Sequence, residues 1–216
     1  MSLVQLITFD PGHFHAALVQ KEMLPGVDAR VHVYAPLGTD LLDHLGRLAG
    51  FNNRDDYPTS WQVEVHAGPD ALSRMLAEKP GTVVVLSGRN RRKIDVIVAS
   101  LRAGLHVLAD KPWVIDASDL PKLDTALEVA RERNLVAWDI MTERYEITSR
   151  LQRSLVGDRR IFGEVDPGSP ERPGVTLESV HYIIKQVAGS ALRRPAWFFN
   201  AEEQGEGLAD VGTHLA

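Results

Sequence analysis

Cysteine is absent from the sequence, and its absence removes several classes of site at once. Without thiols the chain has no disulfide, no zinc site built from thiolates and no cysteine nucleophile. No apolar run approaches the ~20 residues that a membrane span needs. The first residues also lack the basic start and long apolar run of a secretion signal. We therefore expect no membrane among the partners, and a cytoplasmic enzyme fits this composition.

An excess of positive charge is also lacking. The chain has 24 Lys and Arg residues against 29 Asp and Glu residues, and its formal net charge is −5. Such a balance provides no general basic field to attract nucleic acid. One local exception is the basic run at residues 89–93, which either holds a phosphate or forms a solvated loop. The length of 216 residues suits one domain or one and a half, with a sizeable core.

Apolar runs of strand character alternate with amphipathic helical stretches up to about residue 140. Residues 81–87 form a continuous apolar and β-branched run, which is typical of a central parallel strand covered on both faces. Gly104 follows the next predicted helix, residues 94–103, and is the kind of residue that ends a helix. The alternation predicts an α/β fold with a Rossmann-like, doubly wound parallel sheet.

The remainder of the chain has a different pattern. Residues 141–155 read as one amphipathic helix, residues 162–165 as a short strand, and residues 179–187 as a further helix. The proline- and glycine-rich stretch at 166–174 reads as a loop. We interpret this region as the beginning of a second, α+β domain.

The turn after the first predicted strand has the sequence Asp-Pro-Gly-His-Phe-His. A strand, a glycine-containing turn and a helix, here predicted at 16–23, open a nucleotide-binding βαβ unit. The free N–H groups of a helix amino terminus can receive a phosphate. The two histidines have the spacing of a metal-binding pair, but no Asp, Glu or third His is adjacent, so no metal is predicted. The residues expected to contact a cofactor here are Gly12, His13, Phe14 and His15.

The second predicted strand ends without the acidic residue that usually holds the ribose hydroxyls of a dinucleotide. Pro36 stands at that strand end, and the first acid along the chain is Asp40. Either Asp40 binds the ribose from this position or the adenosine end is held differently.

A lysine follows the strand predicted around Val107 and Leu108, within the sequence Asp110-Lys111-Pro112. The carboxyl ends of parallel strands are where ligands bind in an open sheet. Pro112 removes a backbone donor and restricts the preceding residue, so the strand is expected to end there. The pattern places one ammonium group at a strand end. The alternative is a surface lysine that happens to precede a proline.

Two stretches resemble motifs of the Gfo/Idh/MocA family of oxidoreductases. Residues 103–112 resemble A-G-x-H-V-x-x-E-K-P, with Asp110 in place of Glu, and residues 205–214 resemble G-G-x-L-x-D-x-G-x-H. Asn90 falls where the T-P-N motif of the family ends, and residues 161–165 resemble the entry into its second domain. The likeness covers most of residues 81–216.

The resemblance implies hydride transfer between NAD or NADP and a CH–OH carbon of a sugar, polyol or related compound. It assigns three catalytic residues: His214 as base, Lys111 as the group that holds the reacting oxygen, and Asp210 as an orienting carboxylate. It also implies a homo-oligomer formed through the second domain. The further cofactor contacts that it implies are Ser87, Gly88, Asn90, Asp110, Lys111 and Pro112.

Three departures from the family concern the cofactor: the glycine fingerprint is reduced to Gly12, the acid is missing at Pro36, and Lys93 stands where many members have His. Family members are also usually considerably longer. We therefore expect a dinucleotide-binding domain at 1–140 and an incomplete, truncated second domain at 141–216. The alternative function is a non-catalytic nucleotide-sensing or partner-binding protein on the same fold. The sequence selects neither a substrate nor NAD over NADP.

Overall fold

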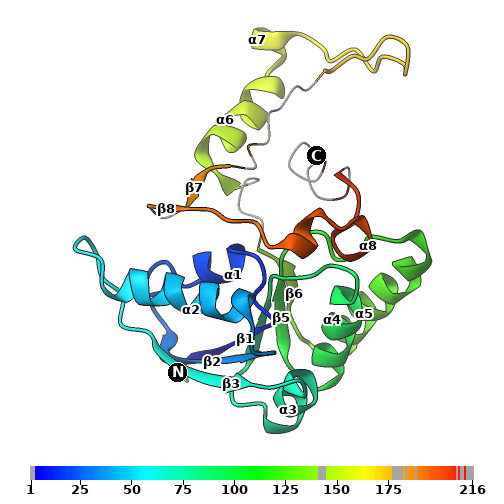
Figure 1. The fold of residues 1–216 in the computed structure, drawn as a ribbon. Coiled ribbons are helices and arrows are strands. Elements are labelled where there is room, and N and C mark those ends of the chain that lie inside the picture. Colours follow the sequence, from blue (N-terminus) through cyan, green and yellow to red (C-terminus); the bar gives the residue numbers. More distant parts are fainter. Residues whose placement is uncertain are drawn as a thin grey trace. The chain divides into compact units, whose positions relative to one another are not determined.

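The computed structural model describes residues 3–140, 145–176, 182, 184–187, 189–207, 209 and 212 (Figure 1). The chain forms two compact units. The first comprises Met1–Ile140 together with Arg194–Asp210, and the second comprises Met141–Arg193 together with Val211–Ala216. The sheet and the described residues of the candidate site belong to the first unit.

Six parallel strands form the sheet of the first unit, in the order β3-β2-β1-β4-β5-β6. This is the doubly wound order of a Rossmann fold, in which the direction of winding reverses between β1 and β4. The predicted fold class is therefore confirmed. The strands are β1 (Val4–Phe9), β2 (Val27–Ala35), β3 (Gln62–Ala67), β4 (Val83–Leu86), β5 (His106–Ala109) and β6 (Ala137–Asp139).

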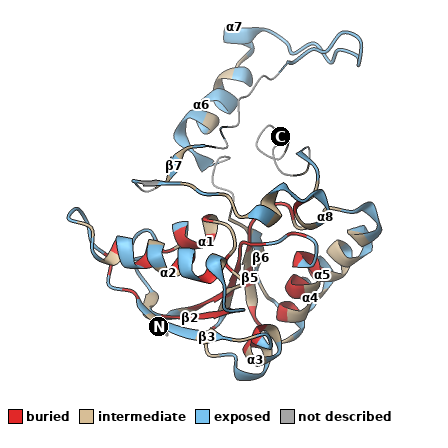
Figure 2. Ribbon diagram, viewed as in Figure 1, coloured by how far each residue is buried: buried red, intermediate tan, exposed pale blue. Residues whose placement is uncertain are grey.

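Helices cover both faces of this sheet, and Figure 2 shows the buried strands between them. On one face, Ala17 of α1 and Leu48 of α2 share a core cluster. On the other, Met75 of α3, Ile97 of α4 and Ala126 of α5 pack together against the strands. The helices are α1 (His15–Leu18), α2 (Thr39–Asn52), α3 (Ala71–Glu78), α4 (Lys93–Arg102) and α5 (Leu120–Glu132), with the 3-10 helix η1 (Ala117–Asp119) before α5.

Helix α1 is a single turn, so the helix predicted over residues 16–23 is wrong in its length. Beyond Leu18 the backbone turns more tightly: the N–H groups of Gln20 and Lys21 donate to residues three positions earlier, at 2.9 and 3.2 Å. The indole N–H of Trp61 donates to the Gln20 carbonyl at 2.6 Å, and Arg54 donates to the Lys21 carbonyl at 2.7 Å. These contacts hold the chain in a turn after Leu18.

The second unit contains α6 (Ile147–Val156), α7 (Arg159–Phe162) and a hairpin of β7 (Gln186–Val187) and β8 (Ser190–Ala191). The strand predicted at 162–165 is wrong, because the Asp158 side chain caps one helical turn that ends at Gly163, where φ is 72°. The helix predicted at 179–187 is wrong at its end, which forms β7, and most of its remainder lies outside the described residues. Among the residues described, no helix has the length and apolarity to cross a membrane.

Buried His44 on α2 makes folding stability depend on pH. Its side chain is buried, its Nε2 atom has no hydrogen-bond partner among the described residues, and burial together with nearby Arg47 lowers its pKa to about 3. Below the ordinary histidine pKa of about 6.5, the unfolded chain takes up a proton that the folded chain does not. Folding stability should therefore fall as the pH falls from 6.5 toward 3.

His44→Leu should remove this contribution. The slope of the unfolding free energy against pH should become shallower by about 1.4 kcal/mol per pH unit between about pH 6 and 4.5. Urea denaturation at a series of pH values measures the slope. An unchanged slope in a folded His44→Leu protein would contradict the assignment.

Candidate functional site

The carboxyl ends of β1, β4 and β5 meet at one edge of the sheet. The backbone N–H of His13 donates to the Ser87 carbonyl at 2.8 Å. The Ser87 hydroxyl donates to the Asp110 carboxylate at 3.1 Å. Three segments that the sequence placed at strand ends are therefore joined by hydrogen bonds.

The Asp110 carboxylate is the centre of this network. It is buried, and it lies 2.7 Å from Nδ1 of His13 and 2.9 Å from Nδ1 of His15. The Lys111 backbone N–H also donates to it, at 2.9 Å. Burial alone would raise the pKa of Asp110, but the hydrogen bonds from His13 and His15 hold it well below the ordinary value. The carboxylate is therefore charged at neutral pH.

His13 is held as a neutral ring of defined tautomer. An arginine side chain can only donate, so the Arg194 guanidinium, 2.8 Å from Nε2 of His13, makes that nitrogen an acceptor. The proton then resides on Nδ1, which donates to Asp110. Burial lowers the pKa of His13 to about 4 against the opposing effect of Asp110, so the ring is neutral at pH 7.

Asp110 also corrects the sequence argument about the two histidines. No acidic residue is adjacent to His13 and His15 in the sequence, but Asp110, 95 residues beyond His15 in the chain, stands beside both rings. Because Nδ1 of His13 carries a proton in this arrangement, hydrogen bonds account for the cluster. The cluster fastens the turn that carries His13 and His15 to the end of β5.

Lys111 is 8% exposed, so the alternative of a surface lysine is wrong. The Lys111–Pro112 peptide bond is cis. A second buried lysine, Lys93 at the start of α4, donates to the Asp110 carbonyl at 3.1 Å and to the Asn90 side-chain carbonyl. The sequence placed Lys93 in the basic run and marked it as a departure from the family, and the structure shows that it is buried and ties α4 to the end of β5.

Two glycines permit the close approach of strand ends. A Cβ atom at Gly88 would stand 2.2 Å from the Asp10 carbonyl oxygen, so only glycine fits between the ends of β1 and β4. A Cβ atom at Gly12 would stand 2.7 Å from the Trp197 ring. Asp10, with φ of 42°, Gly12 and His15 have the spacing of the three glycines in G-x-G-x-x-G.

Trp197 was not assigned to the site from the sequence. It belongs to the 3-10 helix η3 (Ala196–Phe199), which precedes α8 (Ala201–Gln204). Its indole N–H donates to the Asp40 carboxylate at 2.9 Å, and the Arg89 guanidinium lies 5.1 Å from its ring centroid and 3.3 Å from Asp40. Arg89, from the basic run, therefore contacts a carboxylate and an indole.

Asn90 and α8 are also joined. The Asn90 amide donates to the Gln204 carbonyl at 2.8 Å, and the backbone N–H groups of Asn90 and Arg91 donate to the Glu203 carbonyl. Asn90 thus holds α8 against the loop after β4. The contact of Asn90 with a cofactor stays a prediction. The predicted catalytic residues Asp210 and His214 lie outside the described residues.

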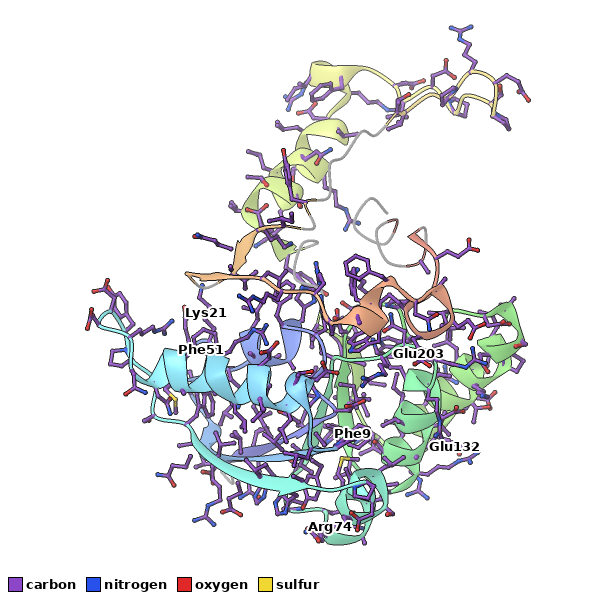
Figure 3. All side chains as sticks on the ribbon, in the orientation of Figure 1. Phe9, Lys21, Phe51, Arg74, Glu132 and Glu203 are labelled. Carbon is purple, nitrogen blue, oxygen red and sulfur yellow. The ribbon has the colours of Figure 1, made fainter. Side chains whose placement is uncertain are left out.

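A cavity of about 260 Å³ opens beside the ends of β1 and β4. Phe9 and Glu203, both labelled in Figure 3, belong to its wall. Pro36 lines it from the end of β2, Leu72 from α3 and Ser87 from the end of β4. The cavity therefore lies at the edge where open α/β sheets bind their ligands.

Comparisons with known proteins agree with this architecture. A family described as "Putative oxidoreductase C terminal domain" matches residues 151–216. A crystal structure described as "a putative oxidoreductase from Parabacteroides merdae" is 48% identical, with a TM-score of 0.93 over 98% of this chain and 48% of that one. The chain belongs to the Gfo/Idh/MocA-type oxidoreductases. It spans about half the length of that Parabacteroides protein.

Two solved structures of lower sequence identity share the fold of this Gfo/Idh/MocA-type chain. An NAD-binding protein from Listeria innocua is 15% identical, with a TM-score of 0.58 over 100% of this chain and 51% of its own. The myo-inositol 2-dehydrogenase of Lactobacillus plantarum is 14% identical, with a TM-score of 0.52 over 74% of this chain and 42% of its own. A search of curated proteins found no match.

Proposed function

We propose that the protein is an oxidoreductase that transfers hydride between NAD or NADP and a CH–OH group of a sugar, polyol or related compound. The observation that carries this proposal is the cavity at the carboxyl edge of the sheet, with Lys111 at the end of β5 on the same edge. In this strand order a dinucleotide binds across the crevice at the switch point. The myo-inositol 2-dehydrogenase activity of a protein with the same fold supports the substrate class.

The residues at the carboxyl edge of the sheet provide some, but not all, of the features of a usual dinucleotide site. In this proposal the cavity takes the adenosine end, the turn at Gly12–His15 and Arg89 contact the diphosphate, and the nicotinamide lies near Lys111. Because α1 is a single turn, its amino terminus contributes less to phosphate binding than a full helix would. Ser87, Gly88, Asn90, Asp110 and Pro112 complete the predicted contacts.

The chain itself supplies the groups that position and deprotonate the substrate, and the nicotinamide supplies the hydride chemistry. The Lys111 ammonium group holds the reacting oxygen and stabilises negative charge on it. By the family resemblance His214 takes the hydroxyl proton and Asp210 orients substrate or base. In this proposal residues 1–140 bind the dinucleotide, and residues 141–216 begin the substrate domain, through which copies of the chain associate.

The Trp197 ring lies where a dinucleotide is expected to approach. In the glycine fingerprint the second glycine lets the backbone come close to the pyrophosphate. Gly12 has that position. The atom nearest to the place where a side chain at Gly12 would begin is Cζ2 of Trp197. A bound diphosphate and the ring therefore compete for the space above Gly12.

Trp197→Ala should strengthen binding of the dinucleotide several-fold, because the ring no longer has to be displaced. Calorimetric titration with NADH and NADPH measures the change. Phe199→Ala, at a 64% exposed position of the same 3-10 helix, is the matched control and should leave the affinity unchanged. Weaker binding in Trp197→Ala would mean that the ring is part of the cofactor site.

The same contact gives the alternative function its support. A protein in which Trp197 covers Gly12, and Arg89 and Asp40 are already paired, fits a nucleotide sensor that binds without turnover. Nicotinamide fluorescence on mixing NADH or NADPH with the protein tests binding. An assay across sugars and polyols then separates an enzyme, which turns over a substrate, from a sensor. Absence of any fluorescence change would contradict both the enzyme and the nucleotide sensor, and would favour a partner-binding protein on this fold.

A further inference from the structure

A second group of titratable side chains stands on the strand pair β2–β3 and shares no residue with the carboxyl-edge site. The parallel register places His32 opposite Glu64 and Tyr34 opposite His66. Alternate residues of a strand point to the same face, so these four side chains lie on one face of the pair. Strand β3 is the outermost strand of the sheet, which leaves the group open at the side.

Three of these side chains have the spacing of metal ligands. Nδ1 of His32 lies 3.2 Å from Nε2 of His66 and 3.5 Å from a carboxylate oxygen of Glu64. In a tetrahedral zinc site with bonds of about 2.0–2.1 Å, neighbouring ligand atoms lie about 3.4 Å apart. Each of the three residues offers one ligand atom, and all three atoms lie within 4.8 Å of one another.

The surroundings of His66 resemble the outer shell of a metal-bound histidine. A metal-bound imidazole usually presents its other nitrogen to a carboxylate. Here the Glu78 carboxylate lies 3.9 Å from Nδ1 of His66, longer than a hydrogen bond, so that bond forms only after a small side-chain shift. The Tyr34 hydroxyl donates to Glu78 at 2.6 Å, and Arg74, labelled in Figure 3, pairs with it at 3.1 Å. The Tyr34 ring also stacks on His66, with centroids 4.2 Å apart and planes at 6°.

Burial and charge allow an ion to enter. The side chains are 9% exposed at His32, 20% at His66 and 47% at Glu64, so the carboxylate faces solvent while the imidazoles are held. Arg30 contacts Oε1 of Glu64 at 3.3 Å, which leaves Oε2 directed at His32. One negative ligand and two neutral ligands suit a divalent ion of the zinc type.

We propose that His32, Glu64 and His66 bind one divalent transition-metal ion, with water completing a four-coordinate shell. The bound ion fastens the outermost strand β3 to β2. The competing arrangement is a hydrogen bond from Nε2–H of His66 to Nδ1 of His32, with Arg74, 3.4 Å away, donating to Nδ1 of His66. The metal site and the hydrogen-bonded arrangement differ in whether the protein takes up an ion.

The test is a calorimetric titration with ZnCl₂ after dialysis against a chelator, paired with the visible absorption of added Co²⁺. The wild-type protein should bind one Zn²⁺ ion and show the bands of four-coordinate Co²⁺. Glu64→Gln and His66→Gln should each lose this binding. Glu78→Gln should weaken it roughly tenfold, as expected for an outer-shell carboxylate. Glu128→Gln, at an exposed position of α5, is the control and should bind as wild type.

Thermal unfolding of the ion-free variants checks that each is folded. Glu64 is half exposed, so Glu64→Gln keeps the test decisive even where His66→Gln unfolds. Absence of binding by the wild-type protein would overturn the proposal. Binding that is undiminished in a folded Glu64→Gln or His66→Gln protein would also overturn it, and would place the ion elsewhere.

Discussion

Asp110→Asn should lower the free energy of unfolding by about 3–5 kcal/mol at pH 7, the cost of removing one partner from a buried charged network. The carboxylate accepts hydrogen bonds from His13, His15, Ser87 and the Lys111 backbone. An asparagine side chain of the same size has one oxygen and presents an NH₂ group to donors. Because the folded pKa of Asp110 is lowered, its contribution is present above about pH 3.8 and is lost as the pH falls through the lower folded value.

Urea denaturation followed by circular dichroism measures this loss. Asp124→Asn, on the exposed side of α5, makes the same chemical change without the network and should shift stability by less than about 0.5 kcal/mol. A loss below about 1 kcal/mol in Asp110→Asn would mean that the network contributes little more than surface hydrogen bonds do.

Lys111→Met should reduce turnover by roughly 10²- to 10³-fold, the usual cost of removing one donor that stabilises developing negative charge. The methionine keeps most of the buried stem and removes the ammonium group. The assay uses whichever sugar or polyol the wild-type protein oxidises, with the same dinucleotide. Lys21→Met, at an exposed position after α1, should retain wild-type turnover. Turnover within about threefold of wild type in Lys111→Met would end the proposed role.

Much of the fold follows from local sequence, because buried parallel strands leave a clear signal. The apolar run at 81–87 became β4, which pairs with both β1 and β5. Gly104 ends helix α4 with φ of 87°, as its position predicted. The length of α1 was not predictable, because Trp61 and Arg54 reach across from distant segments to hold the turn that follows it.

The sequence predicted which residues of the candidate site stand at strand ends. It did not predict the contacts that these residues make with distant segments. Strand periodicity brought Ser87 and Asp110 to one edge, where a hydrogen bond now joins them. The contact of Trp197 with Asp40 spans 157 positions of sequence, and no local pattern encodes it. The partners of a charged group such as Asp110 likewise depend on which loops the completed sheet brings together. The roles of Asp210 and His214 stay predictions from the family resemblance.

The most direct test of the account is calorimetric titration of the protein with NAD, NADH, NADP and NADPH up to millimolar concentration, repeated with Leu72→Trp. The indole fills the cavity beside β1 and β4, which Leu72 lines. The account predicts that at least one dinucleotide binds to wild type and that Leu72→Trp, shown to be folded, weakens this binding at least tenfold. Absence of binding by all four dinucleotides, or equal binding by Leu72→Trp, would contradict it.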